Sequence, residues 1–297
     1  MASKKQNSYN FPEPIDNEQL IGHKSVLQAF NDAWANRDKY PLHPVWILSG
    51  TRGIGKATLA YKIAKQVYGN VGDFYILDIA NENAIGRDSK AKSISVGLVA
   101  RMIEKMQLSS MSGGWRVVLI DSLDEMTPNA ANAILKMLEE PPEKTLFLLI
   151  AHQLNNVLPT IRSRSRIEKL MPLTISQLRD LCAIFLPDED ISTDVLKLAN
   201  GSFGKIASLK TTGGDEIYQE LISVLENSSS NSADMMRTVK KIADKPELRG
   251  ILLDAIAHFG LANLYPTATI DLANVANINL EPEVAIFKIM NDIKKCL

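Results

Sequence analysis

Cysteine and long apolar runs are scarce in this chain of 297 residues. Its two cysteines, Cys182 and Cys296, lie far apart, fit no metal-ligand spacing and are most simply interpreted as reduced thiols of a cytosolic protein. No run approaches the roughly 18 apolar residues of a membrane span, and the polar segment 1–7 lacks the apolar centre of a signal peptide. We therefore expect a soluble, cytoplasmic protein that does not use a membrane.

An excess of charge of either sign is also lacking, because the formal net charge at pH 7 is −1. No overall basic field indicates nucleic-acid binding, so any contact with DNA must be local or come from partners. What the sequence does have is 45% apolar residues, over a length that allows two or three domains with well-packed cores.

Roughly the first 170 residues alternate short apolar runs with amphipathic stretches, which is the pattern of a parallel α/β sheet. The runs that predict buried strands are Val45–Leu48, Phe74–Ile79, Val117–Ile120 and Leu146–Ile150. The polar stretch Asn81–Lys92 predicts a solvated loop, and Thr58–Val67 predicts a helix. The first strand therefore leads through residues 50–57 into a helix, which is the context that a phosphate-binding motif requires.

Residues 50–57 follow the pattern of a phosphate-binding loop as far as its lysine: Gly50-Thr51-Arg52-Gly53-Ile54-Gly55-Lys56-Ala57. The three glycines allow backbone N–H groups to surround a polyphosphate, and the Lys56 ammonium adds a positive charge. The next residue normally carries a hydroxyl that holds Mg²⁺, and Ala57 has none. Thr58 follows, but one step along a helix rotates a side chain by about 100°, so we expect it to point elsewhere.

Asp121 ends the strand predicted at 117–120 and fits the acidic residue that holds the water shell of Mg²⁺. In hydrolysing members of the AAA+ class a glutamate normally follows and polarises the attacking water, whereas here Ser122 follows. Asp124 and Glu125 lie further along and are interpreted as a solvated acidic turn before the next helix, which is predicted to start at Thr127 or Asn129. Ala57 and Ser122 together predict that ATP hydrolysis is lost, while the loop still allows ATP or ADP to bind, with Mg²⁺ held weakly.

After residue 170 the strand signals fade and helical spacing replaces them. Thr174 and Ser192 or Thr193 are predicted to cap two short helices, which form a small helical unit up to about residue 210. Thr211–Gly214 is predicted to be a linker. Apolar residues then recur at helical spacing: Ile217, Leu221, Val224, Leu225, Met235, Val239 and Ile242. They predict a helical C-terminal domain, for which an ordinary bundle core is the simplest interpretation.

Four segments carry a family resemblance: Leu20–His23, His43–Leu48, Thr127–Pro142 with its Leu-Glu-Glu-Pro-Pro ending, and Pro159–Ser165. Together they resemble the clamp-loader subunits of bacterial DNA polymerase III. The third segment is the most specific of them. The fourth resembles the family's Ser-Arg-Cys motif, with Ser165 where cysteine is usual. The resemblance covers about residues 17 to 210 and weakens in the C-terminal helices.

The resemblance implies an α/β P-loop core of the RecA-like AAA+ type at residues 1–170, a small helical lid at 171–210 and an all-α collar at 211–297. It also implies partners: motor (gamma/tau) and delta subunits in a hetero-pentamer that loads the sliding clamp onto primed DNA. Because its nucleotide site is broken, the chain resembles the delta-prime type of subunit, a stator, more than the motor ATPase.

Within the motif at 163–165, the resemblance gives Arg164 a role, with Ser163 beside it. The family's arginine at this place reaches across an interface to the ATP of the neighbouring subunit, as an arginine finger supplied in trans. The alternative is that Arg162, Arg164 and Arg166 form a solvated or DNA-facing basic strip. The family context favours the finger for Arg164 alone.

Three features depart from the family's pattern. Many relatives insert a zinc module after the first helix, whereas residues 66–72 contain no cysteine, so zinc is not expected. The first nucleotide sensor falls at Ala151 or His152, neither of which has a hydroxyl, and His152 is interpreted as a surface residue at a strand end. Gly204 stands in place of the motor's second-sensor arginine.

Two other functions stay open at this point. The first is a catalytically active AAA+ ATPase, such as the motor subunit or a helicase loader, against which Ala57 and Ser122 argue. The second is a P-loop kinase, for which the sequence offers no recognisable acceptor site.

Overall fold

The computed structural model describes residues 11–69, 71–78, 93–107, 113–277 and 281–297, which form two compact units. The first unit comprises residues 11–189 together with 200–204, and the second comprises 190–199 together with 205–297. The predicted loop Asn81–Lys92 lies outside the described residues. The division into core, lid and collar stays a prediction.

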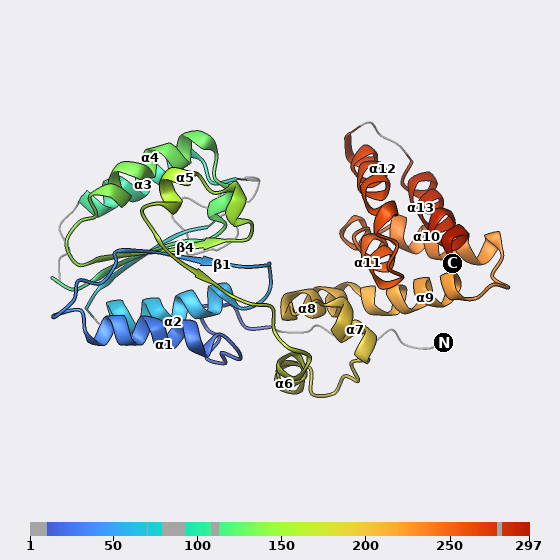
Figure 1. Cartoon of the computed structure of the whole chain (residues 1–297), viewed down its shortest axis with the longest axis horizontal. Helices are drawn as coiled ribbons and strands as arrows, with labels where there is room; N and C mark the ends of the chain where they lie inside the picture. The colour runs from blue at the N-terminus through green and yellow to red at the C-terminus, as the bar shows by residue number, and fades with distance from the viewer. Residues whose placement is uncertain (1–10, 70, 79–92, 108–112, 278–280) are drawn as a thin grey trace. The chain divides into compact units, whose positions relative to one another are not determined.

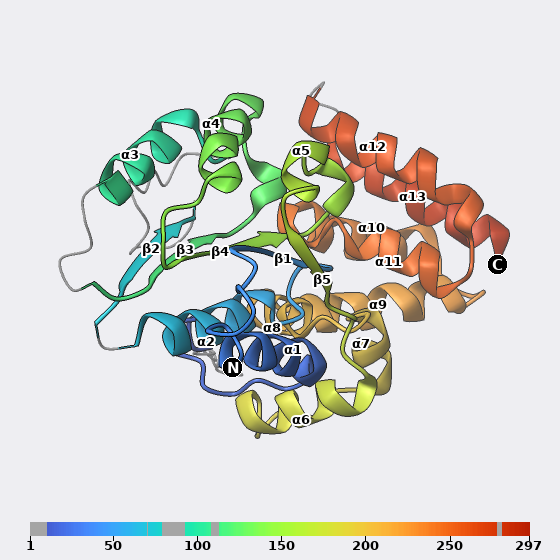
Figure 2. The same ribbon diagram turned by 60° about the vertical axis from the view of Figure 1, so that its left-hand side comes forward.

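The first unit is built on a sheet of five parallel strands in the order β2-β3-β4-β1-β5 (Figure 2). Their bounds are β1 Val45–Ser49, β2 Asp73–Leu77, β3 Arg116–Ile120, β4 Thr145–Ala151 and β5 Arg166–Lys169. The four predicted strands are confirmed to within about two residues, except that Ile79, the predicted end of the second strand, lies outside the described residues. Since β4 lies between β1 and β3, the carboxyl ends of these three strands meet at one edge of the sheet, where the predicted nucleotide residues follow them.

The strand β5 was not expected from the sequence, because Arg166-Ile167-Glu168-Lys169 has no apolar run. It is an edge strand that pairs only with β1 among the described strands, in the register Trp46↔Arg166 to Ser49↔Lys169. Its alternate residues are exposed, and an edge strand needs only one covered face and one paired side.

Helices cover both faces of this sheet (Figure 1). The helices α1 (Lys24–Ala35) and α2 (Lys56–Tyr68) pack on one face with Trp46 and Leu48 of β1, while α3 (Val96–Gln107) and α4 (Pro128–Glu139) pack on the other with Val45 and Ile47. Every residue of β1 and β4 is buried, as expected of central strands covered on both faces. The loops at the carboxyl edge are thereby fixed on a rigid base.

The helix starts follow the predicted caps. Thr127 caps α4 by accepting the N–H of Ala130, and Thr174 forms a capping box at the start of α6 (Ile175–Phe185). Ser192 caps α7 (Thr193–Leu198). Short helical turns occupy Leu123–Glu125 (η1), Leu154–Asn156 (η2) and Pro159–Arg162 (α5).

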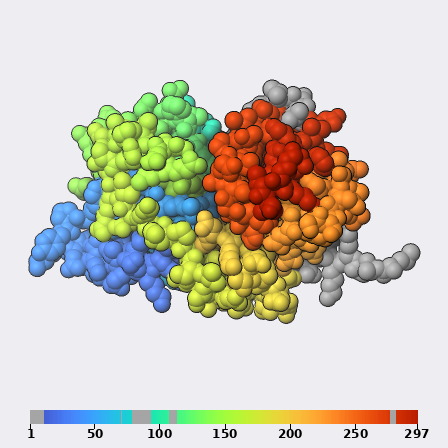
Figure 3. Space-filling model, turned by 45° about the vertical axis from the view of Figure 1, so that its right-hand side comes forward, coloured from blue at the N-terminus to red at the C-terminus, as the bar shows by residue number. Residues whose placement is uncertain are grey.

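The second unit is all helical, and Figure 3 shows its C-terminal helices, orange to red, as one packed body. It contains α7 and most of α8 (Phe203–Thr212), whose first two residues belong to the first unit. The helices that follow are α9 Gly214–Glu226, α10 Ser232–Ala243, α11 Ile251–His258, α12 Tyr265–Asn277 and α13 Pro282–Cys296, with short turns η3 Pro246–Leu248 and η4 Ala262–Leu264. Within the described parts of the chain, no helix combines the length and apolar character needed to cross a membrane.

The predicted linker Thr211–Gly214 is wrong. Thr211 and Thr212 are the last residues of α8, and α9 already begins at Gly214. Gly213 alone, with φ 66° and ψ 26°, turns the chain from one helix into the next. This single glycine therefore makes a tight corner between two helices, and the turn-forming composition of residues 211–214 does not distinguish such a corner from a flexible linker.

Candidate nucleotide site and arginine

The phosphate loop lies between β1 and α2. Gly53 and Gly55 have φ angles of 78° and 99°, in the left-handed region that glycine adopts without strain. Gly55 is the N-cap residue of α2, so the loop delivers its N–H groups to the positive end of a helix. This is the local geometry that phosphate binding requires.

Lys56 is only 3% exposed and already placed within the loop. Its Nζ donates hydrogen bonds to the carbonyl oxygens of Gly50 and Thr51, at 2.7 and 2.6 Å. Burial lowers the pKa of Lys56 to about 8, an effect that the carboxylates of Asp121 and Asp124 oppose. The ammonium is thus still mostly protonated at pH 7, and two carbonyls hold it at the loop.

Asp121 follows β3 and faces the same edge of the sheet as the loop. Burial raises the pKa of its carboxyl group to about 6, and the charge of Asp78 adds to the shift. Its Oδ1 accepts a hydrogen bond from the N–H of Ser122 at 2.8 Å. The Asp121 carboxylate and the Lys56 ammonium, which the sequence predicts at one site, therefore lie close enough for their charges to interact.

Ala57 and Thr58 are the next two residues of α2, and both are partly buried. The Ala57 methyl group packs against the core on the α1 and α2 side, and it has no atom that binds a metal. Within the described ranges, no group of three or more His, Cys, Asp or Glu side chains is arranged to hold a metal ion.

Ser122 stands where the catalytic glutamate of hydrolysing relatives is expected, and it pairs with His152. The distance between Ser122 Oγ and His152 Nε2 is 3.2 Å, and Ser122 itself has φ 59° and ψ 51°. Burial, helped by the charges of Lys56 and Arg52, lowers the pKa of His152 to about 4. The imidazole is therefore neutral at pH 7 and too weak a base to activate water efficiently.

His152 follows the end of β4, as predicted, but it is only partly exposed to solvent. Its Nδ1 is buried without a hydrogen-bond partner among the described residues. No local sequence pattern predicts the contact between Ser122 and His152, because it joins residues 30 positions apart.

The solvated acidic turn predicted at Asp124 and Glu125 is also wrong for Asp124. Its two carboxylate oxygens accept the backbone N–H groups of His152 and Gln153, both at 2.9 Å. These donors emerge where β4 ends and need acceptors, which explains the position of the carboxylate. Glu125 instead forms an exposed ion pair with Arg52 of the phosphate loop, at 2.6 Å.

Ser202 and the first residues of α8 lie directly against the phosphate loop. Gly204 donates its N–H to the carbonyl oxygen of Gly53 at 3.0 Å, and Ser202 Oγ donates to the carbonyl oxygen of Arg52 at 2.9 Å. A Cβ atom on Gly204 would lie 2.8 Å from the Cα of Gly53. Glycine at position 204 thus allows the start of α8 and the phosphate loop to approach closely. The motif pattern alone does not reveal this role for the glycine.

Replacing Gly204 by alanine is expected to lower the free energy of unfolding by about 1–3 kcal/mol, because the added methyl group meets backbone that cannot rotate away. In a helix without this contact, alanine would raise stability over glycine by up to about 1 kcal/mol. A net decrease in the free energy of unfolding would therefore come from the clash with Gly53. Urea denaturation measures it. Gly250→Ala is the matched control, since its Cβ meets nothing within 4 Å; equal effects at both positions would contradict the argument.

Arg164 follows α5 in the turn 163–165 and is held by neighbouring groups. Its guanidinium lies 2.6 Å from Glu139 Oε1 at the end of α4 and donates to the carbonyl oxygen of Thr160 at 2.9 Å. Ser163 Oγ donates to the same carbonyl at 3.1 Å, and Ser165 Oγ donates to that of Ile161 at 2.7 Å. The Arg164 side chain stays 36% exposed, so it is ordered and still accessible.

The three arginines of this region have different surroundings. Arg166 stacks on the ring of Trp46 at 4.1 Å and pairs with Glu168 at 2.8 Å, whereas Arg162 is partly buried. Lys56 and Asp121 therefore lie at one site. Arg164 is held separately, by Glu139 at the end of α4 and by the Thr160 carbonyl in α5.

Comparisons with known proteins agree with this architecture. A family model described as "DNA polymerase III, delta subunit" matches residues 22–174. The DNA polymerase III subunit gamma of Buchnera aphidicola is 28% identical over 202 residues, covering 63% of this chain and 55% of that protein. The subunit delta' of Pseudomonas aeruginosa is 32% identical over 181 residues, covering 53% and 52%. The chain thus spans about half the length of these relatives.

Among solved structures, a DNA polymerase III gamma subunit-related protein of Thermotoga maritima superposes with a TM-score of 0.50 at 14% identity, covering 91% of this chain and 98% of that one. At this level of identity the likeness shows the fold, which is that of a P-loop core with helical C-terminal parts.

Proposed function

Because the chain belongs to the DNA polymerase III delta-subunit family, a clamp-loader family with the AAA+ fold, we propose that it is a clamp-loader subunit of the delta-prime type. In this role it acts in DNA replication as a stator that helps load the sliding clamp onto primed DNA. It hydrolyses no ATP itself and completes the ATP site of a neighbouring subunit.

The observation that carries the proposal is the pairing of Ser122 with His152 at the place of the catalytic base. A serine hydroxyl bonded to a neutral imidazole supplies neither the negative charge nor the basicity that activates water. Ala57 removes the hydroxyl that would hold Mg²⁺. Two parts of the hydrolytic machinery are thus missing, one in the first turn of α2 and one just after β3, while the sheet and helices around them are formed.

The site retains what nucleotide binding needs. Gly50, Gly53, Gly55 and Lys56 supply backbone donors and a positive charge, and Asp121 supplies the acidic group, with Ala57 and Thr58 beginning the helix. ATP or ADP is the proposed ligand of this pocket, with Mg²⁺ held weakly at most. Its role is structural, since the groups that turn over ATP are absent.

Arg164 is the proposed catalytic contribution of the chain. Its guanidinium is ordered by Glu139 and Thr160 and remains accessible, which suits a group that meets the phosphates of another subunit. The proposed partners are motor (gamma/tau) and delta subunits in a hetero-pentamer. The helices from 211 to 297 are proposed to form its collar, with residues 171–210 as the lid and 1–170 as the core.

An active AAA+ ATPase is the competing function, and steady-state hydrolysis distinguishes the two. The purified chain is expected to hydrolyse ATP at the background rate, unchanged in Lys56→Ala, because the base and the Mg²⁺ hydroxyl are missing. Co-expression with motor and delta subunits is expected to yield one stoichiometric complex on size exclusion. Turnover above background that Lys56→Ala abolishes would refute the stator role.

A further inference from the structure

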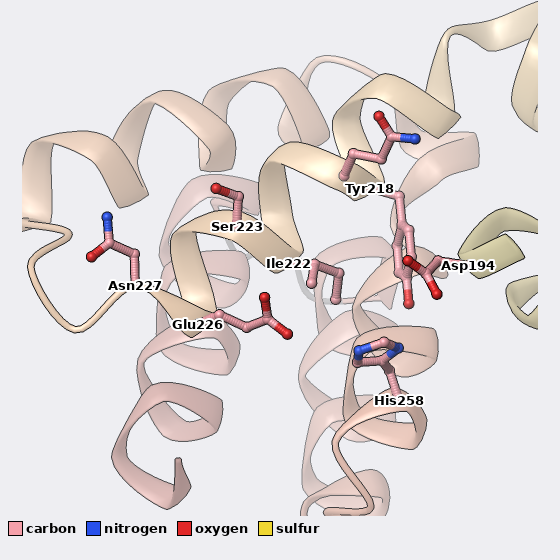
Figure 4. Close-up of a pocket in the computed structure, with 8 residues that line it drawn as sticks. Asp194, Tyr218, Ile222, Ser223, Glu226, Asn227 and His258 are labelled. Carbon is pink, nitrogen blue, oxygen red and sulfur yellow. The ribbon is translucent and has the colours of Figure 1, made fainter. Parts of the chain in front are cut away.

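The second unit contains an open pocket of about 400 Å³ that the proposed clamp-loader role does not use (Figure 4). Its walls come from three helices of this unit, α7, α9 and α11. The pocket is within the size range of small-molecule sites. The side chains that line it indicate which kind of ligand it can bind.

One wall is a row of three residues along α9. Tyr218, Ile222 and Glu226 are spaced i, i+4 and i+8, so they lie on one face of the helix over a length of about 12 Å. Asp194 of α7 and His258 of α11 gather around the tyrosine end in Figure 4, and the Glu226 carboxylate lies at the other end, beyond Ile222. The pocket thus has a carboxylate at each end and an apolar centre.

Tyr218 is the buried member of this row and is 2% exposed. Its ring meets the His258 ring edge-on, with centroids 6.4 Å apart, but its hydroxyl makes no hydrogen bond with any described residue. Burial and the charges of Asp254, Asp194 and Glu226 raise the pKa of Tyr218 to about 12, so the phenol keeps its proton. The side chain is thus almost entirely enclosed, and in Figure 4 its hydroxyl is directed into the pocket, where a ligand can reach it.

The two carboxylates are only weakly neutralised by the protein. Asp194 has Lys197 at 3.8 Å, with both side chains more than 60% exposed, and Glu226 has no ion-pair partner within the described part of the chain. Exposed pairs of this kind contribute little, so both carboxylates are available to a ligand cation. The two carboxylates make the pocket more favourable for cations than for anions such as nucleotides.

We propose that this pocket binds a linear aliphatic polyamine. One terminal ammonium lies between the Asp194 carboxylate and the Tyr218 hydroxyl oxygen, the methylene chain lies on Ile222, and the far ammonium pairs with Glu226. A dication or trication with separated charges fits two carboxylates about two helical turns apart, whereas a single ammonium satisfies only one of them.

Calorimetric titration of the full chain with spermidine at low ionic strength tests the proposal. Wild-type protein is expected to bind with one saturable site. Asp194→Asn with Glu226→Gln is expected to weaken binding by at least about tenfold, since hydrogen bonds to two charged groups are lost, and Tyr218→Phe by about threefold or more. Circular dichroism checks that each variant is folded.

Glu216→Gln is the matched control, because Glu216 is an exposed carboxylate on α9 outside the pocket. Its affinity is expected to stay within about twofold of wild type, as for a remote surface charge. An equal loss in Glu216→Gln and the double variant would show diffuse attraction and overturn the site. Equal affinity for n-butylamine and spermidine would overturn the two-ended arrangement.

Discussion

Arg164→Ala is expected to slow ATP hydrolysis at the adjoining motor site by about 10³-fold or more, the range found for arginine fingers supplied in trans. The guanidinium would stabilise the negative charge that develops on the transferred phosphoryl group. The measurement is DNA-stimulated hydrolysis by a reconstituted complex. The remaining motor copies should lack their phosphate-loop lysines, so that only this site turns over.

The local geometry explains why the effect should be large and specific. Glu139 and the Thr160 carbonyl hold the Arg164 guanidinium at 2.6 and 2.9 Å before any partner is present. An ordered side chain loses less conformational entropy when it engages the phosphates. The ion pair itself is partly exposed, at 36% and 45%, so its loss should cost the chain no more than about 1 kcal/mol of stability.

Two variants separate the finger from other roles. Arg101→Ala removes an exposed arginine from α3 and should leave hydrolysis unchanged. Arg164→Lys keeps the charge but loses the planar donor pair, and it should recover little of the rate. Normal hydrolysis by Arg164→Ala in a complex of correct stoichiometry would reject the finger, whereas loss of the complex would assign Arg164 to assembly.

Local patterns predicted most of the first unit. The runs at 45–48, 117–120 and 146–150 are buried strands because both faces of the sheet are covered, so a continuous apolar run marks them. Thr127 and Thr174 are caps because each bonds to an N–H three residues away. The phosphate loop was equally recognisable, since glycine spacing and the lysine are local properties.

Contacts between distant segments were not predictable in this way. The strand β5 depends on pairing with β1, and the position of the Asp124 carboxylate depends on the end of β4. Likewise, the close approach of Gly204 to Gly53 joins residues that are far apart in the sequence, which neither composition nor periodicity reveals. The same limit applies at the nucleotide site. Ser122 in the sequence indicates that a glutamate base is absent, but the pairing of Ser122 with His152 is visible only in the structure.

The corner between α8 and α9, which composition suggested was a linker, is instead held by a buried ion pair. Lys210 Nζ lies 2.8 Å from Asp215 Oδ2, with side chains only 10% and 13% exposed. Lys210 is in the last turn of α8 and Asp215 in the first turn of α9, so each charge also complements its helix dipole. Lys245 adds a hydrogen bond from its ammonium to the carbonyl of Thr212.

Asp215→Ala is accordingly expected to lower the free energy of unfolding of the second unit by about 3–5 kcal/mol, because it leaves a buried ammonium without its carboxylate. Chemical denaturation followed by circular dichroism measures the loss. Glu216→Ala removes a neighbouring charge from the same helical turn, but an exposed one, and should cost no more than about 0.5 kcal/mol.

A second variant tests whether charge burial, and not side-chain volume, is the cause. Lys210→Met with Asp215→Leu removes both charges and keeps apolar volume at the corner, so it should recover most of the stability that Asp215→Ala loses. If Asp215→Ala is as mild as Glu216→Ala, the pair contributes nothing and the single glycine turn alone fixes the corner. If the double variant is as unstable as Asp215→Ala, the corner depends on the hydrogen bonds of these side chains, and their charges do not explain it.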